Sequence, residues 1–229
     1  MCVKKKIELF MVLFLLIGAI VASWKLSELT AGVSKETKKK KDEIVIVVDP
    51  GHGGEDPGKV GSNDVLEKDL NLKIAKKVIK LLEKEGVKIV TTREDDNVPT
   101  SKKEDLEERI ELINKTNPKL TVCIHQNSFP NASVKGAQVF YYTPSEEGKE
   151  AATIIQEELR TVDTENQREI KANDTYYMLK NTKVPTIIVE CGFLTNPEEA
   201  EKLVNDEYQD KLAKAVCDGI IKWLEKTTK

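Results

Sequence analysis

Two histidines are the first candidates for chemistry in this chain of 229 residues, because each follows a strand-like apolar run. His52 lies in a glycine-rich segment shortly after residues 44–48, and His125 directly follows residues 120–124. In an open parallel sheet, ligands and catalytic groups collect at the carboxyl ends of the strands. Glycines there let a side chain approach a metal or a substrate closely. The pair therefore suggests the metal centre of a zinc hydrolase.

Glu67 is the best candidate for a third zinc ligand. A catalytic zinc takes three protein ligands and keeps one position open for water, and two histidines cannot form a three-histidine site. An apolar stripe at helical spacing follows this residue, formed by Leu70, Ile74, Val78 and Leu81. Because Glu67 lies one turn before that stripe, we expect its carboxylate to face the sheet at the positive end of the helix dipole. The alternative is a glutamate that only caps the helix.

Glu190 is the candidate for proton transfer. It ends the apolar run 187–189, where a buried carboxylate needs a partner or a function. Beside an activated water it could take a proton during attack and pass it to the leaving amine. The alternative is an ion pair with a basic residue such as Arg93. The residues alone leave both interpretations open.

Cys123 is the rival metal ligand, because it lies two residues before His125 and hence on the same strand face. Zinc binds thiolate readily. A ligand at that position would lie deep in the sheet, however, so packing in the core is favoured. Cys191 and Cys217 are also expected to be small buried hydrophobic residues.

Four further polar residues are weaker candidates. Arg93 and Arg109 are expected either to bind a substrate carboxylate or to brace the fold. Asn127 is expected to orient the loop after His125 or to contact substrate. Asp49 is expected to hold His52, since a metal-bound histidine usually donates its other N–H group to an oxygen.

The elements that position these residues alternate between strand and helix, which predicts an α/β class. Strands are expected at 44–48, 87–91, 120–124, 136–142 and 184–189, and helices near 67–85, 103–116, 145–160 and 207–225. We predict a single-domain layered fold over residues 44–229, with a mostly parallel central sheet flanked by helices. No internal repeat or second domain is evident.

The N-terminus differs from the rest of the chain. Residues 4–6 are lysines and precede an apolar run from 9 to 22. This run is shorter than the roughly 20 residues that span a bilayer comfortably. Residues 1–23 are therefore interpreted as a signal peptide or N-terminal membrane anchor, and residues 24–43 as a lysine-rich linker. We expect the chain to be exported, either anchored or secreted, with membrane contact only through this segment.

Composition excludes some classes of protein. A net charge of -3 argues against a nucleic-acid partner. Four cysteines without CxxC spacing argue against a disulfide framework. The glycine-rich segment 51–58 offers a rival interpretation as a phosphate-binding loop, but it lacks the Gly-Lys-Ser/Thr ending and the GxGxxG spacing.

These motifs together resemble the zinc-dependent N-acetylmuramoyl-L-alanine amidases. The matching segments appear in the order of that family and lie at residues 48–54, 67–72, 92–93, 124–127 and 185–196. The resemblance implies one zinc ion held by His52, Glu67 and His125, with Glu190 as the catalytic glutamate. It also implies hydrolysis of the amide between the lactyl group of N-acetylmuramic acid and L-alanine in peptidoglycan, which lies outside the membrane.

A single catalytic domain behind an apolar segment is similar to the sporulation-type members of this family. Those relatives strip peptides from spore-cortex muramic acid so that a lactam can form, and some clostridial relatives work with a lipoprotein partner. The resemblance thus implies a role in the space between forespore and mother cell. The alternatives are a general vegetative autolysin and a catalytically silent wall-binding module. Departures from the family pattern occur at Cys123, Ser128 and Cys191, and no helix between 128 and 185 is expected to plug the site.

Overall fold

The computed structural model describes residue 11, residues 16–25 and residues 44–227. The chain divides into two compact units, Met1–Glu43 and Ile44–Lys229. In the first unit, residues 16–25 are helical. Within the described residues, no helix is both long enough and apolar enough to cross a membrane. Most of the segment interpreted as a signal peptide or anchor, and nearly all of the linker, lie outside the described residues.

The second unit is built on one mixed sheet. In the part of the chain that the structure describes, six strands lie in the order β2-β1-β3-β6-β4-β5. They are β1 (Val45–Pro50), β2 (Lys88–Thr91), β3 (Leu120–Asn127), β4 (Gln138–Tyr142), β5 (Lys171–Asn173) and β6 (Thr186–Phe193). Strands β2, β1, β3 and β6 are parallel, whereas β4 is antiparallel to β6 and carries β5 along its outer edge. The predicted α/β layered fold with a mostly parallel sheet is confirmed.

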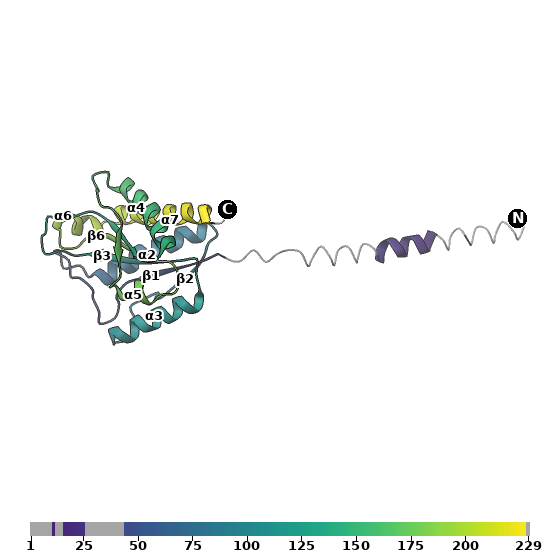
Figure 1. Ribbon diagram of the computed structural model, residues 1–229, viewed down its shortest axis with the longest axis horizontal. Coiled ribbons are helices and arrows are strands. Elements are labelled where there is room, and N and C mark those ends of the chain that lie inside the picture. Colours follow the sequence, from purple (N-terminus) through teal and green to yellow (C-terminus); the bar gives the residue numbers. More distant parts are fainter. Residues whose placement is uncertain (1–10, 12–15, 26–43, 228–229) are drawn as a thin grey trace, which may run out of the picture. The chain divides into compact units, whose positions relative to one another are not determined.

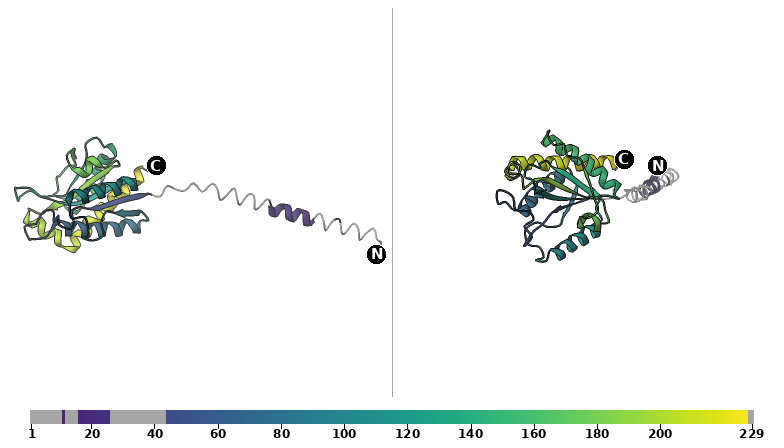
Figure 2. Two further views of the ribbon diagram at one scale, coloured as in Figure 1. Left: turned by 90° about the horizontal axis from the view of Figure 1, so that it is seen from below. Right: turned by 60° about the vertical axis from the view of Figure 1, so that its left-hand side comes forward.

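Helices cover both faces of this sheet (Figure 1). Their bounds are α2 (Glu67–Lys84), α3 (Lys102–Thr116), α4 (Glu146–Val162), α5 (Tyr177–Asn181), α6 (Pro197–Val204) and α7 (Asp206–Thr227). Helices α2, α4 and α7 bury the larger apolar core on one face, and α3 and α5 bury a smaller one on the other. The right-hand view in Figure 2 shows α7, in yellow, and α3, in teal, on opposite sides of the sheet. Strand β5 and helices α5 and α6 are additions to the predicted elements.

Strand periodicity carries polar side chains to one edge of the sheet. Cys123 and Ile188 are buried in the smaller core, toward α3 and α5. Two residues further along the same strands come His125 and Glu190, which therefore share that face at the carboxyl ends. The two residues are directly paired between β3 and β6.

The apolar stripe of α2 is confirmed with one correction. Leu70, Ile74 and Val78 are fully buried, but the next buried position is Leu82, and the predicted Leu81 is only half-buried. An α-helix has 3.6 residues per turn, so a stripe that continues from Val78 falls closer to 82 than to 81. The stripe still leads back one turn to the first helical residue, Glu67.

Candidate metal centre

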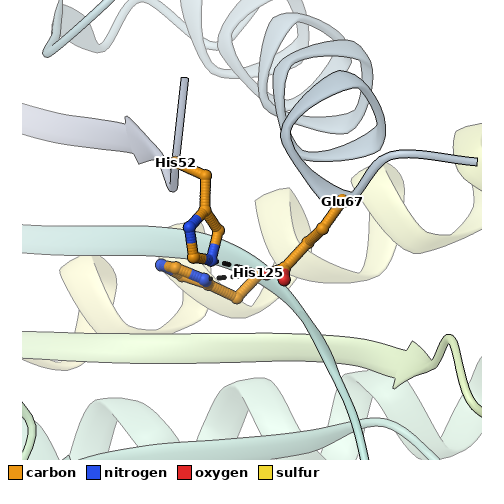
Figure 3. Close-up of side chains that lie close together, drawn as sticks. All are labelled: His52, Glu67 and His125. Atoms are coloured by element: carbon orange, nitrogen blue, oxygen red, sulfur yellow. Dashed lines mark hydrogen bonds and ion pairs between the residues drawn. The ribbon is translucent and has the colours of Figure 1, made fainter. Parts of the chain in front are cut away.

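Three side chains meet at the carboxyl edge of the sheet. His52 comes from the loop after β1, Glu67 is the first residue of α2, and His125 lies on β3. Figure 3 shows the three side chains pointing toward one another, and their ligand atoms all lie within 4.8 Å. Oε1 of Glu67 is 3.2 Å from Nε2 of His52 and 3.0 Å from Nδ1 of His125. Two imidazole nitrogens and a carboxylate oxygen are donors that a catalytic zinc accepts, so this set fits that ion.

Glu67 does not act as a cap of α2, because its carboxylate is held by groups outside that helix. It is 4% exposed, and Oε2 accepts a hydrogen bond from the backbone N–H of Lys59 at 2.8 Å. Oε1 accepts one from the backbone N–H of Gln126 at 3.1 Å. Burial opposes ionisation, but the hydrogen bonds of His125 and His52 outweigh it, and the pKa of Glu67 lies well below its usual range. The carboxylate faces inward as the stripe predicted.

His52 has a backbone conformation that side chains rarely adopt. Its φ of 61° lies in the left-handed region, between strand β1 and two glycines. A non-glycine residue there is uncommon and is typical of functional sites. The conformation leaves Nε2 facing Glu67, while Nδ1 lies 2.9 Å from Oδ2 of Asp56. Asp56 therefore fixes the ring so that Nε2 is available to a metal.

Asp49 is a correction to the predicted partner of His52. Its carboxylate accepts hydrogen bonds from the hydroxyl of Thr92 and from Nη1 of Arg109. Asp49 is on the face of β1 that packs toward α3, which carries Arg109, whereas His52 lies beyond the turn that ends the strand. Asp56, four residues after His52, is the residue that holds the ring of His52, the role predicted for Asp49.

Arg93 and Arg109 brace the fold, which is one of the two roles predicted for them; the other was binding of a substrate carboxylate. Arg93, 5% exposed, donates hydrogen bonds to the backbone carbonyls of Pro50, Gly51, Lys68 and Asp95. Arg109, 3% exposed, donates to Asp49 and Asp105 and to the carbonyls of Pro50 and His52. Because these bonds engage four of the five N–H donors of each buried guanidinium group, the arginines hold the loop that carries His52.

Glycines let the backbone pass close to the metal centre. A Cβ atom at Gly51 would lie 2.1 Å from the ring of His125. One at Gly58, where φ is 65°, would lie 2.6 Å from Oε2 of Glu67. Neither distance is compatible with a side chain, so Gly51 and Gly58 leave room for the side chains of His125 and Glu67.

Glu190 is the strand partner of His125 and forms no ion pair with lysine or arginine among the described residues. Glu190 is 7% exposed, and its Oε2 atom is buried without a hydrogen-bond partner in the described part of the chain. Burial raises the pKa of Glu190 to about 7, although the nearby charge of His125 opposes the increase. The alternative of an ion pair with Arg93 is wrong, because that guanidinium binds backbone carbonyls. A buried, unpaired carboxylate in this position is suited to proton transfer.

The remaining predicted residues lie around the centre. Asn127 accepts a hydrogen bond from the backbone N–H of Ser128 at 2.8 Å, which is the loop-orienting role. Cys123 is fully buried in the smaller core, so the packing interpretation is favoured over the ligand one. Cys191 and Cys217 are also buried, as expected. The centre is bordered by a cavity of about 340 Å³ that Glu190 lines.

Asn71 is a supporting residue that sequence reasoning missed. It is fully buried on α2, one turn after Glu67, and Nδ2 donates to the carbonyl of Gly51 at 3.0 Å and to Oε1 of Glu67 at 3.3 Å. Its Oδ1 accepts a hydrogen bond from Gln126 at 3.2 Å. The amide thus ties the helix, the glycine loop and β3 together. An asparagine four residues after the candidate ligand, on the same helix face, was the available signal.

We expect Asp56→Asn to weaken zinc binding about 10- to 100-fold, the usual effect of losing a group that orients a ligand histidine. The amide can present its N–H to Nδ1, which removes the charge and allows the wrong tautomer of His52. Asp96→Asn is the control, because Asp96 accepts hydrogen bonds from Gly54 and Lys68 in the same region but does not contact His52. Competition with a chromophoric chelator measures both affinities, and equal affinities in Asp56→Asn and wild type would contradict this role.

The fold and the site together define a candidate single-metal hydrolase, with two imidazoles and two carboxylates at the carboxyl edge of an α/β sheet. Residues 46–222 match the family model described as N-acetylmuramoyl-L-alanine amidase, and the chain belongs to this family. The predicted enzyme class is thereby confirmed, and it favours the metal-centre interpretation of segment 51–58 over the phosphate-binding one.

Within this family, the chain is similar to particular amidases. The germination-specific N-acetylmuramoyl-L-alanine amidase of Bacillus subtilis is 38% identical over 188 residues, covering 78% of this chain and 79% of the relative. The structure of the CwlD amidase from Clostridioides difficile, in complex with the GerS lipoprotein, superposes with a TM-score of 0.77 at 39% identity. That match covers 80% of this chain and 98% of CwlD. The amidase LytC of B. subtilis is 33% identical, over 83% of this chain but only 38% of LytC. The chain is therefore a CwlD-like amidase.

Proposed function

We propose that this amidase uses one zinc ion, held by His52, Glu67 and His125, to hydrolyse the amide between N-acetylmuramic acid and the L-alanine that begins the stem peptide. The observation that carries the proposal is the unpaired, buried carboxylate of Glu190 on the cavity wall beside the three donors. A purely structural carboxylate would have a partner at this depth.

When bound, zinc supplies Lewis acidity, which lowers the pKa of water and polarises an amide carbonyl. Glu190 takes the proton from the attacking water as the C–O bond forms. It then delivers that proton to the nitrogen of L-alanine as the C–N bond breaks, so that a carboxylic acid and a free amine leave. A pKa raised toward 7 suits a group that must first accept and then donate a proton near neutral pH.

Removal of the metal tests this proposal. Treatment with a chelator is expected to abolish release of L-alanine amino groups from peptidoglycan, and addition of about one equivalent of zinc should restore it. Zinc content is measured on the same samples. Full activity in protein shown to hold less than a tenth of an equivalent of any metal would overturn the zinc centre.

The proposed role of Glu190 also predicts a cost in stability for the metal-free protein. Its pKa in the folded state, about 7, lies above the ordinary value of 4.5, so the folded state binds more protons than the unfolded state between these pH values. Stability therefore falls as pH rises through this window. Replacing the group with neutral glutamine in Glu190→Gln should stabilise the metal-free protein by up to about 3 kcal/mol at pH 8 and by little at pH 4.5.

Urea unfolding of both proteins at the two pH values, in the presence of a chelator, measures this difference. A Glu190→Gln variant that is less stable than wild type at pH 8 would show that Glu190 has a stabilising partner, contrary to its buried and unpaired state.

We further propose that the enzyme is exported and acts on spore cortex, where it prepares muramic acid for lactam formation before germination. The name of the B. subtilis relative and the similarity to CwlD support this role. LytC is the reason to keep a vegetative autolysin as the alternative. Deleting the gene should give spores whose cortex lacks muramic lactam, with normal vegetative growth. Normal cortex together with impaired cell separation would favour the autolysin.

A lipoprotein partner is also proposed, because the solved CwlD structure holds one. Within the described residues of the second unit, none of α4 lines the cavity, and α4 packs against α7 and β4. We therefore do not propose that a helix between residues 128 and 185 blocks the cavity. We propose instead that a partner protein controls activity. Co-purification from sporulating cells with a tagged chain tests the association.

A further inference from the structure

Helix α3 presents one stripe of residues to the cavity beside the metal centre. The stripe consists of Lys102, Asp105, Leu106 and Arg109, whose spacing puts them on one face of the helix. Arg109, at the far end of the stripe, donates a hydrogen bond to the carbonyl of His52 at 2.7 Å. Lys102 lies two turns earlier, as the first residue of the helix, and the proposed mechanism gives it no role.

A lysine is an unfavourable residue at this position. The N-terminus of an α-helix carries a partial positive charge, which favours anions such as Glu104 and Asp105 in the first turn of α3. The side chain of Lys102 is 65% exposed, and its Nζ lies 2.9 Å from Oδ2 of Asp56. The helix itself thus does not favour a lysine here, whereas the ion pair with Asp56 does.

The other cation of the cavity lining has different partners. Arg109 is buried, and its guanidinium pairs with Asp49 at 2.8 Å and with Asp105 at 2.9 Å. The ion pair of Lys102 is with Asp56. The two cations of the stripe therefore bind separate carboxylates, and the charge of Lys102 acts at Asp56.

The oxygen that Lys102 contacts is the one that orients His52. Oδ2 of Asp56 lies 2.9 Å from Nδ1 of His52, and Oδ1 accepts a hydrogen bond from the backbone N–H of Gly58 at 3.1 Å. Asp56, His52 and Gly58 all belong to the glycine-rich segment 51–58. Among the described residues, Lys102 supplies the ion pair that ties this carboxylate to an element outside that segment.

We infer that Lys102 is a positioning residue for the metal centre. Its ammonium group anchors the carboxylate of Asp56 to α3, and Asp56 in turn holds the ring of His52 with Nε2 facing the other two donors. The inference rests on the proposed function, because it takes His52 as a zinc ligand. Helix α3 thus holds His52 twice, through Arg109 at its backbone and through Lys102 and Asp56 at its ring.

The test is the zinc affinity of the full chain, measured at low salt by competition with a chromophoric chelator. Lys102→Gln should bind zinc about two- to fivefold more weakly than wild type, the range that the free energy of an exposed ion pair allows. Lys102→Arg should keep the wild-type affinity, because it restores the cation. The difference between wild type and Lys102→Gln should shrink at about 1 M salt, where charges are screened beyond roughly 3 Å.

A double variant separates this role from a general loosening of α3. If Lys102 acts through Asp56, then Lys102→Gln combined with Asp56→Asn should bind zinc as weakly as Asp56→Asn alone. A further two- to fivefold loss in the double variant would show that Lys102 acts by another route, and the inference would be wrong.

Lys103→Gln is the matched control. Lys103 is the next residue of α3, its side chain is 79% exposed, and its Nζ lies 3.7 Å from Glu107. Because it does not contact Asp56, its replacement should leave the zinc affinity at the wild-type value. The same loss in Lys103→Gln as in Lys102→Gln would reduce the effect to the net charge of the helix and would contradict the inference.

Two further outcomes separate this inference from the proposed function. Zinc binding by Lys102→Gln that equals or exceeds that of wild type would overturn the positioning role and leave the proposed centre in place. Wild type that binds no zinc would overturn the proposed centre and this inference together.

Discussion

Replacing Glu190 with glutamine is expected to lower kcat on peptidoglycan by about 10² to 10⁴, the usual contribution of a general acid–base group. The amide has nearly the same shape as the carboxyl group and fits the same space, but it cannot accept a proton from water. Because Glu190 is not among the three metal donors, the variant should still bind one zinc ion per chain. Release of L-alanine amino groups and zinc content, measured on the same sample, separate the two properties.

Glu199→Gln is the control for this substitution. Glu199 is a second buried carboxylate, 4% exposed, but it accepts hydrogen bonds from the backbone N–H groups of Gly136 and Phe193 and does not line the catalytic cavity. The change there should lower stability and leave kcat within a few-fold of wild type. A Glu190→Gln variant that keeps more than a tenth of wild-type activity would remove Glu190 from the mechanism.

Replacing His125 with alanine is the second large effect, and here the expected loss is of the metal itself. His125 supplies one of three donors, so its removal should weaken zinc binding by more than the roughly 10- to 100-fold caused by losing a supporting hydrogen bond. We expect less than a tenth of an equivalent of zinc to remain after dialysis, and activity to be lost with it. Elemental analysis of the dialysed protein provides the measurement.

Asn127→Ala serves as the matched control, since Asn127 lies two residues further along β3 and its side chain contacts the backbone of Ser128. This variant should keep one zinc ion. Full zinc occupancy in His125→Ala would mean that another set of donors holds the metal, and the assignment of the centre would be wrong.

The placement of three of the four main residues could be predicted because it depends on local periodicity. Alternation along β3 and β6 carries His125 and Glu190 to the same face and edge of the sheet. The helical stripe that ends at Leu82 leads back to an inward Glu67. These rules need only the spacing of apolar residues, which the chain displays clearly.

The surroundings of His52 could not be predicted in the same way. The residue has a left-handed backbone in a loop braced by Arg93 and Arg109, which come from distant parts of the chain. Loop geometry of this kind is not encoded in a repeat, so Asp49 was assigned as partner where Asp56 holds the ring. Because Arg93 and Arg109 are far in sequence from this loop, their role as substrate-binding or bracing residues could not be predicted either.

Short elements were missed for a related reason. Helix α5 has five residues and β5 has three, too few to display a period. Yet α5 and the residue before it line the cavity beside the metal centre through Tyr176, Tyr177 and Met178. The residues assigned to catalysis were therefore accessible from the sequence, whereas the lining of the cavity beside them required the structure.

The central claim is that this chain cuts the amide between muramic acid and L-alanine. The most direct measurement digests purified peptidoglycan with the zinc-loaded full chain, labels the new amino termini and identifies the labelled residues and any new reducing sugar ends. The account predicts that the new amino termini are on L-alanine and that no reducing ends appear, with Glu190→Gln releasing almost none. New termini on another residue, new reducing ends, or no release at full zinc occupancy would contradict it.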